Sequence, residues 1–191
     1  AEWARHAERL GFDGLFLGDR MLPEATAEDG VVYGRSMLEV TTLLAGLAAS
    51  TERLLLGSLV LVLPYRHPLP LAKTLASLDV ISEGRIVLGA GVGWNRREFA
   101  ALGIDPSERG RRFEAALETM RRLWRGERVS ERTPWWELED VALAPLPHGG
   151  RQLPVWIASF SPESALDWTD RPPRSAWRVL ERVGRLADGW V

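Results

Sequence analysis

The residue pattern most suggestive of chemistry is the glycine run "GAGVGW", residues 89–94, which ends an apolar segment and precedes the polar stretch "NRRE". The dinucleotide-binding pattern G-x-G-x-x-G fails here, because Trp94 stands at the third glycine and no acidic residue ends a strand about 20 residues later. A phosphate-binding P-loop fails as well, since no Lys-Ser or Lys-Thr pair follows the glycines. The run therefore indicates either close packing of a buried strand or a ligand of another kind. Its place at the end of a strand favours the ligand.

Several other chemistries lack the residues that they need. The chain has no cysteine, which excludes disulfides, thiolate nucleophiles and cysteine-based zinc sites. Its three histidines do not have the spacing of metal ligands, so no metal site is expected. A formal net charge of −2 provides no basic surface for nucleic acid. No apolar run reaches the roughly 18 residues of a membrane helix, and a signal peptide is lacking, so we expect a cytoplasmic protein without membrane contact.

The elements that must position the glycine run alternate between strand-like and helix-like segments, which predicts an α/β fold with a parallel sheet. The expected strands are nearly continuous apolar runs, as in sheets that are covered on both faces. They span residues 12–19, 53–64, 85–92 and 153–159.

The helix-like segments between these strands have recognisable ends. Ser36 and Glu39 have the spacing of a capping box, which predicts a helix over 36–49. Leucines at helical spacing predict a second helix over 68–82. An Asp-Pro pair begins a third, over 105–124, with the aspartate as cap and the proline in the first turn.

Two connections, 20–35 and 126–152, are longer than ordinary loops, which is typical of functional insertions. Within the second, "WWELEDVAL" has the pattern of a small antiparallel hairpin. Asp79, late in a helix, and Arg85, at the start of the next strand, are expected to form an ion pair that fixes the helix against the sheet. Both ends of the chain look truncated, because the first residues already have helical spacing and "LADGWV" stops where a strand would begin.

The sequence of residues 51–124, from "TERLLLGSLVLVLPYRHP" through "SEGRIVLGAGVGWNRREF" to "MRRLW", resembles the luciferase-like monooxygenase superfamily, and especially its F420-dependent oxidoreductase group. The segments "AERLGFDGLFLGD", "LPVWIAS" and "RLADGW" extend the resemblance over nearly the whole chain. It implies a TIM-type (β/α)8 barrel, of which residues 1–191 form one partial domain with strands two to five and the start of six. A complete barrel has about 250 residues.

The resemblance also implies where a cofactor would lie. In this family the flavin or deazaflavin ring crosses the carboxyl-terminal mouth of the barrel, where a bulged third strand supports it. Carried over, Leu61 and Val62 would support the ring, and Gly91 and Gly93 would let the backbone approach it. Taken singly, the two aliphatic residues are equally well explained as ordinary strand core.

The phosphate of the cofactor is implied at the loop after the fifth strand, where the family has a Gly-Gly-x-Ser type of sequence. This chain has "ASFSPES" instead, so the family glycines are replaced by Ala158 and Ser159. Hydroxyls and free amides at the start of a helix attract phosphate, although a simple helix cap explains Ser161 nearly as well. The residues implied for phosphate binding are Ser159, Phe160, Ser161 and Ser164.

Proton transfer is the weak point of the resemblance. Family members often have an acid-histidine pair after the second strand, whereas this chain has Asp19 followed by Arg20. Arginine stays protonated near neutral pH, so Arg20 could bind an anionic substrate or stabilise developing charge but could not act as a base. The proton would then pass through Asp19 or through Glu98, which lies where several deazaflavin enzymes have an acid. A solvated Glu98 paired with a neighbouring arginine is an equally good interpretation.

The function implied is hydride transfer between coenzyme F420 and a small organic substrate, with a homodimer as a further expectation. An FMN-dependent monooxygenase that uses O2 is the first alternative, because the two branches share most motifs and the cofactor decides the reaction. A non-catalytic flavin-binding barrel, or an inactive fragment, is the second, because Arg20 and the loop "ASFS" depart from the family pattern.

Overall fold

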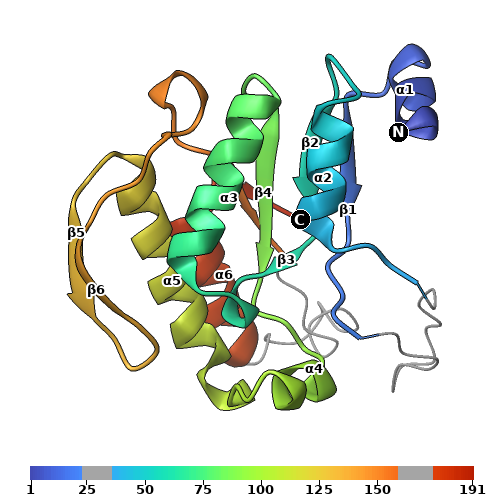
Figure 1. Cartoon of the computed structure of the whole chain (residues 1–191). Coiled ribbons are helices and arrows are strands. Elements are labelled where there is room, and N and C mark those ends of the chain that lie inside the picture. Colours follow the sequence, from blue (N-terminus) through green and yellow to red (C-terminus); the bar gives the residue numbers. More distant parts are fainter. Residues whose placement is uncertain (23–35, 159–173) are drawn as a thin grey trace.

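The computed structural model describes residues 1–22, 36–158 and 174–191 of the 191-residue chain (Figure 1). Its main feature is a parallel sheet. The strands of this sheet are β1 (Gly14–Leu17), β2 (Leu55–Ser58), β3 (Leu61–Val62), β4 (Ile86–Gly91), β7 (Val155–Ile157) and β8 (Gly189–Trp190). They lie in the order β1-β2-β4-β7-β8, and β3 pairs with the far end of β4. The predicted α/β fold with a parallel sheet is confirmed.

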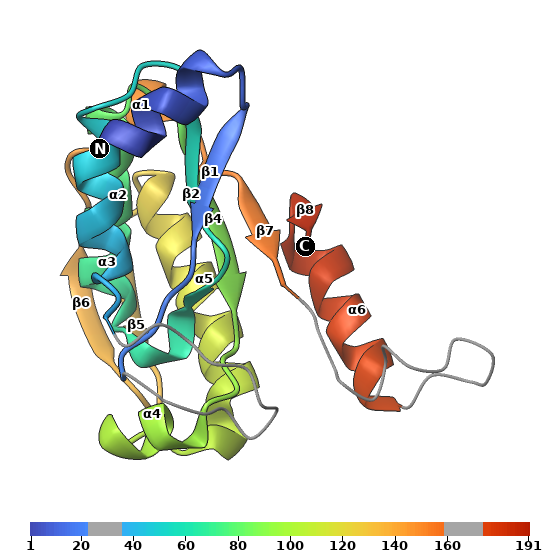
Figure 2. The same cartoon turned by 90° about the vertical axis from the view of Figure 1, so that its right-hand side faces the viewer.

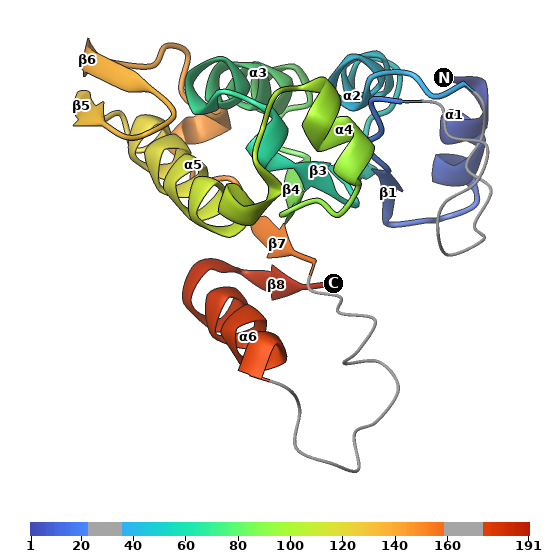
Figure 3. The ribbon, with the colours of Figure 1, turned by 90° about the horizontal axis from the view of Figure 1, so that it is seen from below.

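Helices connect the strands and cover the sheet. They are α1 (Glu2–Arg9), α2 (Val40–Ala48), α3 (Pro68–Ile81), α4 (Arg96–Ala101), α5 (Arg109–Trp124) and α6 (Arg174–Leu186), with short 3-10 helices η1 (Leu63–Tyr65), η2 (Pro106–Glu108) and η3 (His148–Gly150). Helices α2, α3 and α5 stand side by side along one face of the sheet (Figure 2). Beyond β7, the sheet continues to β8, which lies beside α6 (Figure 3). No helix in the described ranges is long and apolar enough to cross a membrane.

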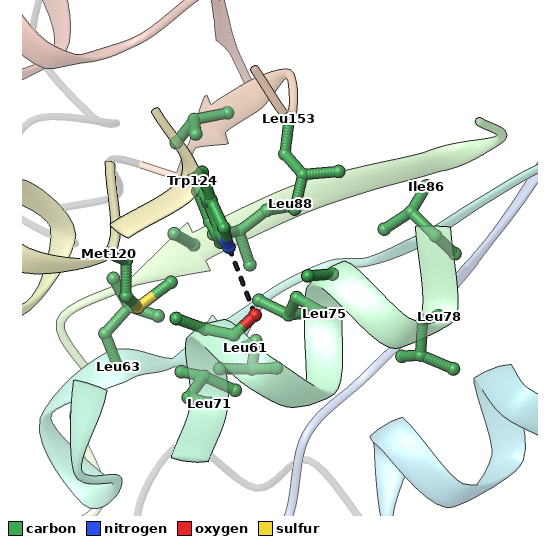
Figure 4. Close-up of a cluster of buried hydrophobic side chains, with 14 of the residues drawn as sticks. Leu61, Leu63, Leu71, Leu75, Leu78, Ile86, Leu88, Met120, Trp124 and Leu153 are labelled. Carbon is green, nitrogen blue, oxygen red and sulfur yellow. Dashed lines mark hydrogen bonds between the residues drawn. The ribbon is translucent and has the colours of Figure 1, made fainter. Parts of the chain in front are cut away.

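The core lies between β4 and the helices α3 and α5 (Figure 4). The helix predicted over 105–124 is formed by η2 and α5, and α5 buries six apolar residues at helical spacing. They are Phe113, Ala116, Leu117, Met120, Leu123 and Trp124. The indole Nε1 of Trp124 donates a hydrogen bond of 3.1 Å to the backbone oxygen of Ala72 on α3, which satisfies its polar group within the core.

The hairpin predicted from "WWELEDVAL" is confirmed as the antiparallel pair β5 (Val129–Arg132) and β6 (Glu137–Val141). The strand expected over 53–64 is divided into β2, β3 and η1. The capping box is a wrong prediction, because α2 begins only at Val40. Its cap is the carboxylate of Glu39, which accepts a hydrogen bond of 2.8 Å from the amide of Thr42.

The ion pair expected between Asp79 and Arg85 is also wrong. The buried carboxylate of Asp79 instead binds Arg151, with Nη2 to Oδ1 at 2.6 Å, and so fixes the long connection against the end of α3. Arg85 donates to the backbone oxygens of Ala48 and Thr51 at 3.0 and 2.8 Å. Ala48 ends α2 and Thr51 lies shortly after it, where carbonyl groups lack helical partners and need donors from elsewhere.

Candidate functional site

A pocket of about 380 Å³ lies at the carboxyl ends of the parallel strands, where α/β sheets bind their ligands. Segments that directly follow β1, β2, β4 and β7 contribute to its wall. The lining residues are Gly18, Asp19, Arg20, Met37, Leu59, Val60, Val62, Tyr65, Gly91, Val92, Gly93, Trp94, Asn95, Glu98 and Ala158. The pocket thus combines an apolar wall with a few ionisable side chains, as ligand sites commonly do.

Six of the residues predicted for the site meet in this pocket. They are Asp19, Arg20, Val62, Gly91, Gly93 and Glu98. Leu61 does not reach it, because side chains alternate along an extended chain and that of Leu61 is fully buried in the core. Val60 and Val62, on either side of it, line the pocket instead. The predicted phosphate-binding residues Ser159, Phe160, Ser161 and Ser164 lie outside the described residues.

The segment around Val60 and Val62 lies so close to the end of β4 that only glycine fits at positions 91 and 93. A Cβ atom on Gly91 would lie 2.4 Å from Cγ2 of Val60, and one on Gly93 would lie 2.6 Å from Cγ1 of Val62. Gly93 also has a φ of +78°, which side-chain-bearing residues rarely adopt. These glycines therefore pack closely against the neighbouring segment and also line the pocket.

The carboxylate of Asp19 is held by two neighbours. Its Oδ2 accepts hydrogen bonds from Nη1 of Arg66 at 2.5 Å and from the amide of Val62 at 2.9 Å, and its Oδ1 accepts from Nη2 of Arg66 at 2.9 Å. Burial alone would lower the pKa of Arg66, but the carboxylates of Asp19 and Glu39 raise it overall. Asp19 thus fixes the end of β1 against β3, and both of its oxygens are occupied.

Glu98 is 2% exposed and lies in the first turn of α4. Asn95 caps that helix, since its Oδ1 accepts from the amides of Arg97 and Glu98 at 2.9 and 3.4 Å. The Oε1 atom of Glu98 accepts from the amides of Met21 and Leu22 at 2.9 and 3.2 Å. The predicted alternative of a solvated surface glutamate is wrong, because the side chain turns inward and ties α4 to the segment after β1.

Arg20 brings a positive charge into the same wall. Its Nε lies 3.9 Å from Oε1 of Glu98, and its guanidinium lies 5.0 Å from the ring centre of Trp94, in cation–π geometry. Since 56% of Trp94 is exposed, this indole is no core residue. The charge of Arg20 is therefore fixed near the carboxylate of Glu98.

Sequence reasoning missed Tyr65, which is 8% exposed and lines the pocket. Its ring packs edge-on against Phe99, with ring centres 4.9 Å apart. It belongs to the segment "LPYRHP", which also contains His67. His67 caps α3, where its Nδ1 accepts from the amide of Leu69 at 3.2 Å, and it is not among the lining residues.

The family is decided by sequence comparison. The model of the luciferase-like monooxygenase family matches residues 1–167. The chain belongs to this family.

Luciferase-like relatives of this chain include enzymes of two kinds. Limonene 1,2-monooxygenase from Rhodococcus erythropolis is 35% identical over 161 residues, which are 84% of this chain and 39% of the relative. An F420-dependent glucose-6-phosphate dehydrogenase from Microbacterium testaceum is 31% identical over 189 residues, 97% of this chain and 49% of the relative. The chain therefore spans less than half the length of these two relatives.

Solved structures of luciferase-like TIM barrels have the same fold. A monooxygenase from Streptomyces bottropensis superimposes with a TM-score of 0.72 at 29% identity, over 83% of this chain and 46% of that one. An F420-dependent secondary alcohol dehydrogenase in complex with an F420–acetone adduct gives 0.77 at 19% identity, over 99% and 52% of the two chains. At that identity the second comparison supports the fold alone.

Proposed function

We propose that the protein is an oxidoreductase that transfers hydride between coenzyme F420 and a small organic substrate. In this proposal residues 1–191 form one partial (β/α)8 domain that contributes strands two to five and the start of six, with insertions at 20–35 and 126–152. The observation that carries the proposal is the pocket of about 380 Å³ at the strand ends, which joins an apolar wall to a buried carboxylate. The F420-dependent relative that aligns with 97% of the chain supports the choice of cofactor.

The pocket residues fit a planar ring cofactor. Val60 and Val62 supply an apolar surface, and the glycines at 91 and 93 have no side chains that would narrow the space beside it. When bound, a deazaflavin supplies a carbon that accepts or donates hydride. Binding of its phosphate by residues 159–164 stays a prediction.

The ionisable residues have separate roles in this proposal. Arg20 holds a negative charge on the substrate, or stabilises charge that develops there, because it stays protonated. Glu98 accepts or returns the proton that accompanies hydride transfer. Asp19 positions the wall rather than moving a proton, because both of its oxygens bind Arg66.

An FMN-dependent monooxygenase is the second candidate function. It is supported by limonene 1,2-monooxygenase at 35% identity and by the solved monooxygenase at 29% identity. The ring pocket does not distinguish the two cofactors, because both have the same tricyclic shape, whereas a flavin can also activate oxygen.

Titration of the intact protein with F420 and, separately, with FMN tests the proposal. We expect the fluorescence of F420 to change saturably on binding and FMN to bind much more weakly. Tight FMN binding without F420 binding would replace the proposal by the monooxygenase. Binding of either cofactor without turnover of its reduced form would support the non-catalytic barrel instead.

A further inference from the structure

Tyr65 occupies a defined position between the core and the pocket. It ends η1, directly before Arg66, whose ion pair with Asp19 fixes this turn. Phe99 holds the ring from one side, and the residue lines the pocket while being only 8% exposed. The ring of Tyr65 is therefore held in place in the wall of the pocket.

The charged groups that face this hydroxyl come from the segments after β1 and β4. Burial raises the pKa of the Tyr65 hydroxyl, and the carboxylates of Glu98 and Asp19 raise it further, while Arg20 acts in the opposite direction. The hydroxyl is consequently protonated throughout the ordinary pH range, and a free tyrosinate is unfavourable beside two carboxylates.

Glu98 brings a carboxylate into the same wall, and its Oε1 atom is held by the segment after β1. The amides of Met21 and Leu22 both donate to Oε1, and Nε of Arg20 is nearest to the same atom. These contacts hold the carboxylate through Oε1, in the lining of the same pocket as Tyr65.

We propose that Tyr65 relays a proton between an oxygen of the bound substrate and Glu98, so that the substrate is an alcohol or the corresponding carbonyl compound. The inference rests on the proposed function, which supplies the hydride acceptor. In alcohol oxidation, the substrate O–H proton passes to Oη of Tyr65 while the tyrosine's own proton passes to Glu98. The C–H hydrogen leaves with two electrons as hydride to the deazaflavin, which gives a carbonyl product, an unchanged tyrosine and a neutral glutamic acid.

Other groups around the pocket are less suited to this role. Arg20 cannot give up its proton, and both oxygens of Asp19 bind Arg66. His67 caps α3 and does not line the pocket. A concerted relay also avoids the tyrosinate that the neighbouring carboxylates disfavour.

A first test needs no cofactor. Tyrosine labelled with 13C at Cζ gives one signal for each of the two tyrosines of the chain, and Tyr65→Phe identifies the signal of Tyr65. We expect this signal to titrate at higher pH than a free tyrosine does in the wild type, and to begin its shift at lower pH in Glu98→Gln. Identical titrations in the two proteins would show that Glu98 does not act on the Tyr65 hydroxyl, and would overturn the relay.

The second test measures F420 reduction by 2-propanol and by cyclohexanol in the intact protein. Tyr65→Phe keeps the ring and its contact with Phe99, so we expect unchanged F420 binding and kcat lower by roughly a hundredfold. Glu98→Gln should have a similar effect, and the double variant should be no slower than either single one, because both changes break the same path. Ser77→Ala removes a hydroxyl on α3 away from the pocket and serves as the control.

The outcomes separate the relay from the proposed function. Multiplying effects in the double variant, or unchanged kcat in Tyr65→Phe, overturn the relay and leave the proposed function intact. A wild type that binds F420 but oxidises neither alcohol also overturns it. A wild type that binds neither F420 nor FMN overturns the proposed function, and the relay with it.

Discussion

Arg66 forms a bidentate ion pair with Asp19, in which Nη1 lies 2.5 Å from Oδ2 and Nη2 lies 2.9 Å from Oδ1. The two residues are 47 positions apart, and only 2% of the Asp19 side chain is exposed. Because Asp19 also accepts the amide of Val62, this pair joins the end of β1 to β3 and to the turn that carries Tyr65. The shape of the pocket depends on it.

Asp19→Asn should therefore lower stability more than an ordinary polar substitution does. The change leaves the guanidinium of Arg66 without its main counter-charge in a mostly buried position, which costs about 3 kcal/mol. The free energy of unfolding, measured by urea titration of both proteins, checks the prediction. Asp140→Asn is the matched control, because Asp140 pairs with Arg128 at a site where both side chains are 64% exposed, and it should change stability little. Equal effects of the two substitutions would contradict the structural role of Asp19.

Gly91→Ala should weaken both stability and cofactor binding. The added Cβ would lie 2.4 Å from Cγ2 of Val60, so Val60 must move in the wall of the pocket. We expect a loss of about 1–3 kcal/mol in the free energy of unfolding, as for other overpacked sites.

Gly46→Ala provides the comparison for this substitution. Gly46 lies within α2, where a Cβ would meet no atom within 4 Å, and alanine should stabilise the helix by up to about 1 kcal/mol. Thermal unfolding and cofactor titration of both variants measure the contrast. Unimpaired cofactor binding by Gly91→Ala would show that Val60 does not contact the ligand.

Trp124→Phe should destabilise the protein by about 2 kcal/mol, from lost volume in the core and a lost hydrogen bond. The tryptophan is fully buried between α5 and α3, and its Nε1 donates to the oxygen of Ala72 (Figure 4). Trp177→Phe on α6 is the control, since Trp177 is 51% exposed. Denaturant midpoints of the two variants should differ clearly, and similar midpoints would argue against a buried Trp124.

Glu39 should make stability depend on pH in the acid range. Burial by itself would raise the pKa of the Glu39 carboxyl. Hydrogen bonds from the amide of Thr42 and from the hydroxyls of Thr41 and Thr42 outweigh burial, and they lower this pKa from the ordinary value of 4.5 to about 2. A lowered pKa in the folded state stabilises the protein above pH 4.5, and this contribution is lost as the pH falls towards 2. The difference in unfolding free energy between wild type and Glu39→Gln should therefore shrink over this range. A constant difference from neutral pH to pH 2 would contradict the prediction.

Much of the local structure could be predicted because its causes are local. The buried face of α5 follows from apolar residues at helical spacing, and the hairpin β5-β6 follows from its strand pattern. The predicted start of α2 is wrong. Ser36 and Glu39 have the spacing of a capping box, but Glu39 itself caps a helix that begins at Val40. The ion pair predicted between Asp79 and Arg85 is wrong for a similar reason. Tertiary packing places Arg151 beside Asp79 and the oxygen of Thr51 beside Arg85, and proximity along the chain does not predict these contacts.

The sequence by itself determined the family, the α/β class and the strand end at which the pocket lies, because these follow from motifs and from the order of elements. Only the tertiary structure decided which side chains share that pocket. It brought Tyr65 and Glu98 into the lining of one pocket from separate segments, buried Leu61 in the core and paired both oxygens of Asp19 with Arg66. Such pairings depend on how the strands pack and which face each residue takes, and spacing along one chain does not contain that information.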